Sequence, residues 1–415
     1  MKILAFIESN TSGTGRLFAR AAAAFRLRPV LLSADPSRYP YAAEDALKVV
    51  RVDTQDAEAL IDACRRLAAG PGLAGVTSSS EYFVATAAKV ASSFGLSAPN
   101  HEAVAACRDK HAQRVRLRAA GVGNPAFRLA DSVGAAQSAA GELGFPVVVK
   151  PVYGSGSVGV KLCDDAAAVA AHSASLFSQR YNERGQPIPH VVLVEEVASG
   201  PEFSVETFDA SVVGVTRKHL GPLPDFVEVG HDYPAALGAA EEQGLRAEAL
   251  RALRALGLGW GPAHVELRVT AGGPKIIEVN PRLAGGFIPE LVRHASGVDL
   301  IAAAVARVAG REPDLTPRGA LYASLRFFVA GREGTLAAVA GLEAARAEPG
   351  VKGVEIYRAV GERLSVRGDF RDRVGHVLAV GETPEAARAA AEAAHARVVL
   401  GVRADSEAAR GGVDE

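Results

Sequence analysis

The stretch HVELRVTAGGPKIIEVNPR, residues 264–282, decides how this chain is expected to fold. It contains two runs typical of β-strands, VELRV and KIIEV, and the glycine-containing connection AGG between them predicts a hairpin. If Thr270 pairs with Pro274, Glu266 lies directly opposite Glu278. Like charges in that position destabilise a sheet by roughly a few tenths to 1 kcal/mol. A divalent cation bound between the two carboxylates would compensate for their repulsion.

Two further residues of the second strand strengthen this interpretation. Asn280 follows Glu278 by two positions, so both side chains project from the same face of the strand. Two carboxylates and an amide oxygen form an oxygen-only set, which suits Mg²⁺ (or Mn²⁺) shared with substrate phosphates. Arg282 adds a planar cation suited to a phosphoryl group or a carboxylate. The alternative is a solvent-facing hairpin with scattered charges.

Length, composition and charge restrict the class of protein. The 415 residues predict two or three domains, and 48% hydrophobic residues with 6% aromatics fit a well-packed α/β protein. A net charge of −1 predicts no bulk attraction to nucleic acid or an anionic membrane. No run approaches the roughly 18 apolar residues of a membrane span. Three widely spaced cysteines without a CxxC pattern favour a reducing compartment. We therefore expect a cytoplasmic enzyme without nucleic-acid or membrane partners.

The two ends of the chain have different patterns of predicted strands and helices. Residues 1–100 alternate short apolar runs with alanine-rich helical stretches, which predicts a parallel sheet wrapped by helices. Residues 101–145 look helical and linking, and residues 221–235, which include His231, are expected to form a loop. The turn SGTGR (12–16) is either a phosphate cradle or a tight turn, and it lacks the full glycine fingerprint of a nicotinamide-dependent dehydrogenase. From about residue 311 the chain is a mixed strand–helix module, and its last residues (406–415) are expected to be disordered.

A glycine- and serine-rich loop, residues 153–159, follows a strand that ends at Lys150. Small residues let backbone N–H groups approach phosphate oxygens, and the hydroxyl groups of Ser155 and Ser157, beside Gly156, donate as well. The loop joins two strands instead of opening a helix, which argues against a Walker P-loop. By itself such a loop is an ordinary turn, but with the lysine and the acidic hairpin it predicts a nucleotide site.

Another apolar strand closes with Glu195, Glu196 and Val197. The backbone of such a segment offers N–H and C=O groups to an adenine edge, and Glu202 is placed to bind ribose hydroxyls. Acidic residues at strand ends are also common without any such role.

Taken in order along the chain, these motifs resemble the ATP-grasp superfamily. The resemblance rests on CRDKHAQR, VVVKPVYGSGSVGV, LVEEVASGPEFSVE, HVELRV and IIEVNPRLAGG. It implies an α/β (α+β) fold with three parts. These are a Rossmann-like pre-ATP-grasp domain at 1–105, the ATP-grasp nucleotide-binding and catalytic region at 106–310, and a small C-terminal α+β module with its tail at 311–415.

The resemblance also implies a role for each motif residue. Lys110 and Lys150 would bind ATP phosphates under the flexible loop 153–159. The segment Glu195, Glu196, Val197 and Ala198 would hold adenine, with Glu202 near the ribose; carboxylase-type relatives carry a basic residue where this chain has Glu196. Glu266, Glu278 and Asn280 would take Mg²⁺, and Arg282 would steady an acyl phosphate.

The stretches FVEVGHDYPA and NPRLAGGFIPELV look most similar to L-amino-acid ligases, which form dipeptides. His231 would touch the acyl phosphate or substrate, or it caps the following turn. Arg217 and Lys218 would attract a substrate carboxylate, or they are a solvated strand end. Gly285 and Gly286 would let substrate approach the backbone, or they make the turn into the next helix.

In this family a carboxylate attacks the γ-phosphoryl group of ATP, and an amine then displaces phosphate from the acyl phosphate. We therefore expect a carboxylate–amine ligase for small molecules, with an amino acid or a similar acid as substrate and a free amine as acceptor. A homodimer is left open. The alternatives are a purine-pathway or biotin-carboxylase-like member of the superfamily, and a non-catalytic ATP-binding protein.

Overall fold

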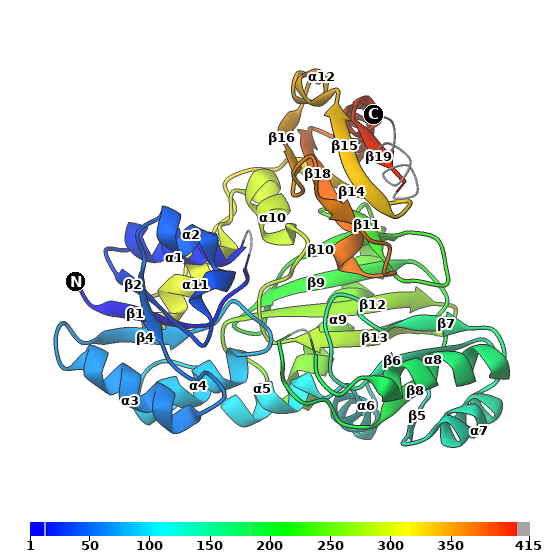
Figure 1. Ribbon diagram of the computed structural model, residues 1–415, viewed down its shortest axis with the longest axis horizontal. Coiled ribbons are helices and arrows are strands. Elements are labelled where there is room, and N and C mark those ends of the chain that lie inside the picture. Colours follow the sequence, from blue (N-terminus) through cyan, green and yellow to red (C-terminus); the bar gives the residue numbers. More distant parts are fainter. Residues whose placement is uncertain (12–13, 183, 405–415) are drawn as a thin grey trace, which may run out of the picture.

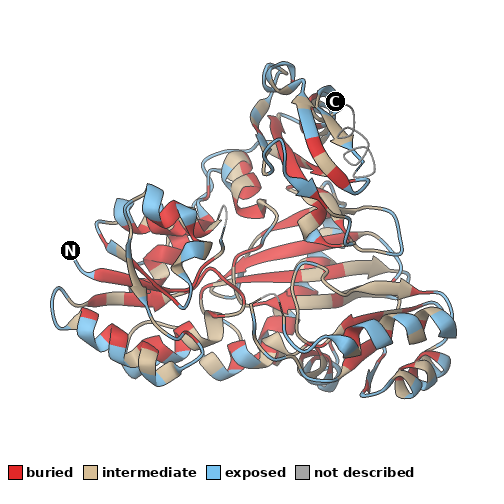
Figure 2. Cartoon of the chain, in the orientation of Figure 1, coloured by how far each residue is buried: buried red, intermediate tan, exposed pale blue. Residues whose placement is uncertain are grey.

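The computed structural model describes residues 1–11, 14–182 and 184–404. The tail 406–415, and part of the turn 12–16, lie outside the described residues. Figure 1 shows the chain arranged around a large central sheet, with the N-terminal sheet beside it and the C-terminal strands continuing from it. Buried residues concentrate in the sheets (Figure 2).

The N-terminal region is the parallel sheet expected from the sequence. Its strands follow the order β3-β2-β1-β4 and are all parallel: β1 (Ile3–Ile7), β2 (Arg28–Ser33), β3 (Lys48–Arg51) and β4 (Leu73–Thr77). Its main helices are α1 (Thr14–Ala24), α3 (Ala57–Ala68) and α4 (Val84–Ser93), with the short α2 (Pro40–Glu44). In α3, residues Leu60, Ala63, Cys64 and Leu67 are buried, which is the spacing of one helix face.

A second, antiparallel sheet carries the glycine-rich loop. Its order is β5-β8-β6-β7: β5 (Phe127–Ala130), β8 (Val192–Glu196), β6 (Val147–Pro151) and β7 (Lys161–Cys163). Helices α7 (Val133–Leu143) and α8 (Ala166–Ser178) cover it, and α5 (His101–Arg108) and α6 (Lys110–Ala119) lead into it. The strand β5 was not expected, because its four residues FRLA lie in a stretch that looked helical.

The central sheet has eight strands in the order β13-β12-β9-β10-β11-β14-β18-β16. Its first half comprises β9 (Glu202–Phe208), β10 (Ser211–Leu220), β11 (Glu228–Tyr233), β12 (Pro262–Thr270) and β13 (Gly273–Asn280), packed by α9 (Ala239–Leu256). The interpretation of 221–235 as a loop was wrong for β11. Backbone pairing of β11 with β10 and β14 decides its conformation, although the run is short and follows a proline-rich turn.

The C-terminal strands complete this sheet. The strands β14 (Tyr322–Val329), β16 (Val351–Ile356) and β18 (Arg373–Gly381) belong to it, whereas β15 (Gly334–Ala340), β17 (Arg363–Leu364) and β19 (Val399–Arg403) form a separate small sheet. Helices α12 (Leu342–Arg346) and α13 (Pro384–Arg397) pack here. The helices α10 (Ile288–Ser296) and α11 (Leu300–Val308) share one hydrophobic core with the N-terminal strands.

The hairpin of β12 and β13 has the expected pair of glutamates but a different turn. Glu266 pairs with Glu278, as predicted, whereas Thr270 pairs with Gly273 and not with Pro274. The register shifts by one residue between these two points, where Ile277 forms a β-bulge. The tighter turn and the bulge offset each other, so the two carboxylates still face each other.

Candidate functional site

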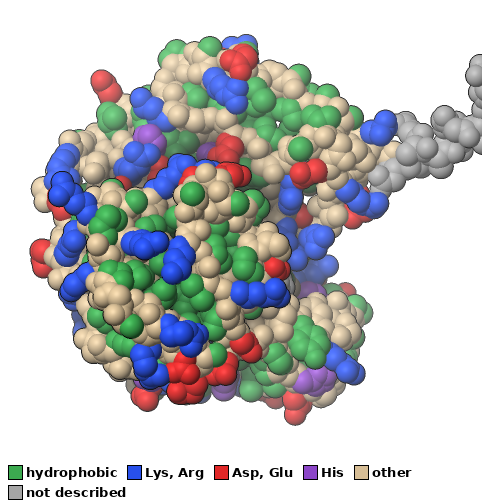
Figure 3. All heavy atoms as spheres, turned by 60° about the vertical axis from the view of Figure 1, so that its left-hand side comes forward, with side chains coloured by type: hydrophobic (Ala, Val, Ile, Leu, Met, Phe, Trp, Pro, Cys, Tyr) green, Lys and Arg blue, Asp and Glu red, His purple; other side chains and the backbone are tan. Residues whose placement is uncertain are grey.

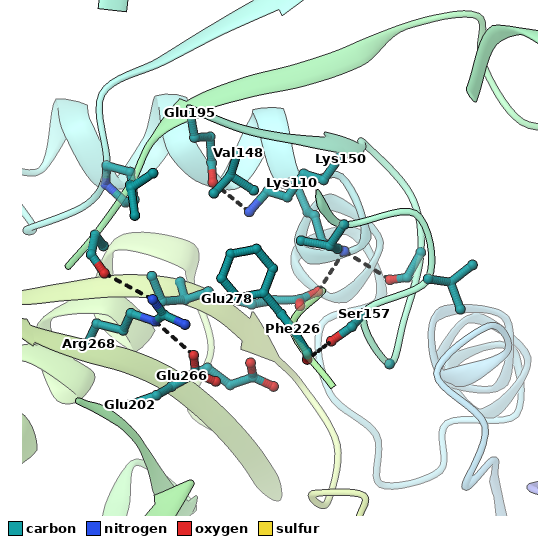
Figure 4. Close-up of a pocket in the computed structure, with 18 of the residues that line it drawn as sticks. Lys110, Val148, Lys150, Ser157, Glu195, Glu202, Phe226, Glu266, Arg268 and Glu278 are labelled. Carbon is teal, nitrogen blue, oxygen red and sulfur yellow. Dashed lines mark hydrogen bonds and ion pairs between the residues drawn. The ribbon is translucent and has the colours of Figure 1, made fainter. Parts of the chain in front are cut away.

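One cleft brings the acidic hairpin together with the glycine-rich loop and the lysine-tipped strand (Figure 4). Thirteen residues singled out in the sequence line it: Lys110, Lys150, Ser155, Gly156, Ser157, Glu195, Glu196, Val197, Ala198, Glu202, Lys218, Glu266 and Glu278. Its volume is about 110 Å³. Pockets for drug-sized ligands measure about 300–1,000 Å³, so the cleft is narrower here than such a pocket.

Each glutamate of the hairpin is held by a lysine. Lys110 Nζ lies 2.9 Å from Glu278, and Lys218 Nζ lies 3.0 Å from Glu266. The second oxygen of Glu266 lies 3.0 Å from His264 Nε2. Burial alone would raise the pKa of Glu266, but Lys218 and His264 hold it far below the usual value. The carboxylate is therefore ionised, with one oxygen on Lys218 and the other on His264.

Lys218 is the centre of a buried cluster of carboxylates. Its Nζ lies 2.9 Å from Glu202, 2.8 Å from Glu228 and 3.0 Å from Glu266. Burial opposes its charge, yet these three carboxylates raise the pKa of Lys218 well above its ordinary value. Each carboxylate also has a second cationic partner, which is Arg268 for Glu202, Arg373 for Glu228 and His264 for Glu266, so the cluster is a network of alternating charges.

His264 connects the hairpin to a second buried acid. Its Nδ1 lies 3.0 Å from Glu206, which lies on the adjacent strand β9. Burial disfavours the charged imidazole, but Glu206 and Glu266 together raise the pKa of His264 to about 9. The positive imidazolium fixes the position of Glu266. Sequence reasoning missed this pair; the signal was the alternation of His264 and Glu266 on one strand face.

Lys150 is buried and forms an ion pair with the buried Glu195. Its Nζ lies 2.6 Å from Glu195, and Arg114 Nε lies 2.5 Å from the other oxygen of the same carboxylate. Burial lowers the pKa of Lys150. Burial would raise the pKa of Glu195, but Arg114 and Lys150 hold it below the usual value. The Glu195 side chain is thus engaged by two cations, which leaves only the backbone of this segment for the expected contact with adenine.

The glycine-rich loop is held by three side-chain hydrogen bonds and by a backbone hydrogen bond from Phe370 to Gly156. Lys110 Nζ donates to Gly154 O at 2.9 Å, Ser155 Oγ donates to Glu81 at 2.8 Å, and Ser157 Oγ donates to Phe226 O at 2.8 Å. Gly156 has φ +64°, and a Cβ there would lie 2.4 Å from the Phe370 ring. Glycine favours this conformation, and any larger residue would have to displace the Phe370 ring.

Glu81 is a candidate site residue that sequence reasoning missed. It follows β4 of the N-terminal sheet, is buried, and contacts Arg282, Arg108 and Ser155. Burial would raise its pKa, but Arg282 and Arg108 lower the pKa of Glu81 to about 2. An acidic residue just after the carboxyl end of a parallel strand was the available signal, because ligands gather at that edge.

Two polar contacts close the end of the cleft near β8. Arg268 Nε donates to Glu202 at 2.9 Å, and its Nη1 donates to Ala198 O at 3.2 Å (Figure 4). Glu196 forms an ion pair with Lys275. The guanidinium group of Arg268 therefore connects the expected adenine segment with the expected ribose residue.

Arg217 is not in this cleft. It precedes Lys218 on β10, so the two side chains point to opposite faces of the sheet, and Arg217 lines a different cavity. Both residues were expected to attract the same substrate carboxylate. They cannot do so, because their side chains lie on opposite faces of β10.

Four other expected site residues lie beside the cleft without lining it: Asn280, Arg282, Gly285 and Gly286. Asn280 pairs with His264, and Arg282 binds Glu81. His231, expected in a loop, is on β11 and fully buried; its Nδ1 lies 3.0 Å from Gly286 O and its Nε2 lies 2.9 Å from Glu228. Burial lowers the pKa of His231. This histidine supports Glu228 from behind, and Glu228 lines the cleft.

The donor set of the hairpin suits a hard divalent cation. Glu266 and Glu278 face each other on one side of the sheet, and Asn280 continues the same face. In the described part of the chain no three His, Cys, Asp or Glu side chains converge as a ready metal site. Lys110 and Lys218 occupy the carboxylates instead, so a metal ion would take over contacts that the lysines make here.

Comparisons with known proteins agree with this geometry. Residues 143–290 match the model of the ATP-grasp domain, and residues 326–403 match L-amino acid ligase C-terminal domain 2. An uncharacterized protein of Sinorhizobium fredii, y4rH, is 42% identical over 91% of this chain and 78% of its own length. The chain belongs to the ATP-grasp superfamily and is an ATP-grasp carboxylate–amine ligase.

More distant relatives are similar to parts of the chain. Carnosine synthase 1 of Gallus gallus is 32% identical over 49% of this chain, and the matching region covers only 24% of that protein. Dapdiamide A synthase of Enterobacter agglomerans is 30% identical over 47% of each chain. The crystal structure of an L-amino acid ligase from Bacillus licheniformis has the same fold, with a TM-score of 0.80 at 22% identity over 97% of this chain and 99% of that one.

No helix in the described part of the chain is long and apolar enough to cross a membrane. Side chains of both charge signs are interspersed over the face shown in Figure 3.

Proposed function

We propose that this protein joins the carboxylate of an amino acid, or of a similar acid, to a free amine with ATP. The products are an amide or peptide bond, ADP and phosphate, and the intermediate is an acyl phosphate. The relatives named as carnosine and dapdiamide synthases support this substrate class, as does the C-terminal match to L-amino acid ligases. The chain would act through the three regions 1–105, 106–310 and 311–415.

The residues of the cleft divide the chemistry among them. Lys110 and Lys150 would exchange their carboxylate partners for phosphate oxygens, and the backbone of 195–198 would hold adenine, with Glu202 at the ribose. Glu266, Glu278 and Asn280 would hold Mg²⁺, which when bound neutralises charge on the transferring phosphoryl group. Arg282, released from Glu81, would steady the acyl phosphate.

The shared cleft carries the proposal. The lysine-tipped strand continues directly into the glycine-rich loop (147–159), and this segment meets the distant hairpin that carries the opposed glutamates (262–280) around one cavity. Phosphoryl transfer requires this combination of cations, metal ligands and a closing loop. Among the lining residues in the described part of the chain there is no serine–histidine pair or cysteine arranged as a covalent nucleophile, so direct attack by the substrate carboxylate is the fitting step.

Two measurements test this proposal. Pairs of amino acids are supplied with ATP and Mg²⁺, and phosphate release and product mass are recorded. The productive acid is then labelled with ¹⁸O in its carboxylate, and we expect one label atom in the released phosphate because that oxygen attacks the γ-phosphoryl group. Stimulation by bicarbonate or ribonucleotides and by no amino acid would contradict the proposal, as would tight ATP binding without turnover.

A further inference from the structure

A second, larger cavity lies on the opposite face of the central sheet, beneath α13. Its volume is about 540 Å³, and its walls come from β9, β10, β11, β14 and the first turns of α13. Strand pairing aligns its floor: Arg217 faces Phe203 on β9 and Asp232 on β11, and Asp232 faces Ser324 on β14. None of these residues lines the first cleft.

Arg217 is the unusual member of this floor. In the part of the chain that the structure describes, no carboxylate lies within ion-pair distance of it, and its guanidinium carbon lies 4.8 Å from the centre of the Phe203 ring. Its Nε is buried and has no hydrogen-bond partner. A guanidinium group so placed has unused donors directed along a sheet face, and a buried unsatisfied donor is costly.

The neighbouring charges do not supply the missing anion. Asp232 is already occupied by Arg326 Nη1 at 2.8 Å, by His219 Nε2 at 2.7 Å and by Ser324 Oγ at 2.7 Å. Arg388 Nε approaches Asp232 only to 3.4 Å, and it too is buried without a hydrogen-bond partner. The cavity therefore contains two guanidinium nitrogen atoms with unused donor capacity.

We propose that this cavity is a second ligand site, which binds the carboxylate of a small organic acid through Arg217 and Arg388. A planar guanidinium group matches a carboxylate in geometry. The lining is largely polar, but Leu220, Tyr322 and Pro234 add apolar surface that can contact the organic part of such a ligand. The site is separate from the nucleotide cleft and does not depend on the proposed reaction.

Equilibrium binding to the full chain tests this site. The probes are hexanoate and 3-phenylpropionate, their neutral amides, and inorganic phosphate, each followed by calorimetry with and without MgADP. We expect the wild-type protein to bind at least one of the acids, whether or not MgADP is present, and the matching amide to bind at least tenfold more weakly. Arg217→Gln should weaken acid binding at least tenfold, whereas the exposed control Arg66→Gln should leave it unchanged.

Any of four results would overturn the site. Neither acid binds, MgADP abolishes acid binding, Arg217→Gln leaves acid binding intact, or phosphate binds in preference to the acids. If Arg217→Gln fails to fold, a crystal structure of the wild-type protein soaked with the tighter acid decides. The carboxylate must then contact Arg217, and any other location contradicts the proposal.

Discussion

The two faces of β10 place neighbouring basic residues in opposite environments. On the cleft face, Lys218 contacts three carboxylates, whereas on the other face its neighbour Arg217 has none within ion-pair distance among the described residues. The strand separates a face rich in acids, suited to a metal ion with its nucleotide, from a face with spare guanidinium donors. Two adjacent basic residues therefore cannot be assigned the same role from their sequence position.

The most severe test of the cleft face is Glu278→Ala. The change removes one of the two opposed carboxylates, and we expect Mg²⁺-dependent phosphate release to fall by at least about 10²-fold while the fold persists. Circular dichroism monitors folding, and Glu142→Ala, an exposed acid paired with Arg128, is the control. Near-normal turnover would remove the metal assignment.

Lys218→Met tests whether the acids on this face need a cation. Because the buried Glu202 and the half-buried Glu228 and Glu266 lose their shared partner, we expect the free energy of unfolding to drop by about 3 kcal/mol. Added Mg²⁺ should recover more stability in the variant than in the wild-type protein, as measured by urea unfolding. Lys352→Met is an exposed control. If Mg²⁺ stabilises both proteins equally, the carboxylates around Lys218 do not bind the metal ion.

His264 predicts how the stability of the cleft face depends on pH. Because Glu206 and Glu266 raise its pKa from 6.5 to about 9, the folded state binds the proton more tightly than the unfolded state. The bound proton contributes about 3 kcal/mol to the free energy of unfolding. This contribution is complete below pH 6.5 and is lost as the pH rises through 9. Urea unfolding across that range should show a steeper decline for the wild-type protein than for His264→Gln. Parallel declines would contradict the assigned proton.

Lys150→Ala should weaken ATP binding by about 10- to 100-fold, because a charged phosphate contact is lost. Arg114 remains paired with Glu195, so the fold should persist. Calorimetry measures the affinity, with the exposed Lys48→Ala as the reference. Unchanged nucleotide affinity would exclude Lys150 from the phosphate site.

The smallest expected effect concerns the loop over the cleft. Gly156→Ala should cost about 1 kcal/mol or more, because the residue has φ +64° and its Cβ would displace Phe370. Gly141→Ala, in an open position of α7, should instead stabilise by about 1 kcal/mol. Thermal unfolding compares the two. If removing the ring with Phe370→Ala does not reduce the penalty of Gly156→Ala, the ring contact is unimportant.

The sequence was most informative where local periodicity and chemistry agreed. The parallel N-terminal sheet followed from alternating strands and helices, and the opposed pair Glu266 and Glu278 followed from the hairpin. The bulge at Ile277 was invisible, because it depends on how the backbone meets its neighbour and not on residue type. The correct pairing was reached with a turn that was wrong by one residue.

Long-range contacts explain what the sequence did not reveal. The strand β11, which contains His231, is formed by backbone pairing with β10 and β14, and β14 lies about ninety positions later in the chain. Glu81 follows a strand of the N-terminal sheet and Arg282 follows a strand of the central sheet, so nothing in the sequence indicated that these two residues meet. The placement of Arg217 was available in principle, since strand alternation alone separates it from Lys218.

The pairing of β11 with β14 has a consequence for recombining this chain with its relatives. A cut near residue 311 would leave β11 as an unprotected border, inviting aggregation, and would take away the Phe370 ring that rests on Gly156. Chimaeras that exchange the last hundred residues must therefore be designed as strand replacements within one sheet, with the join matched hydrogen bond by hydrogen bond.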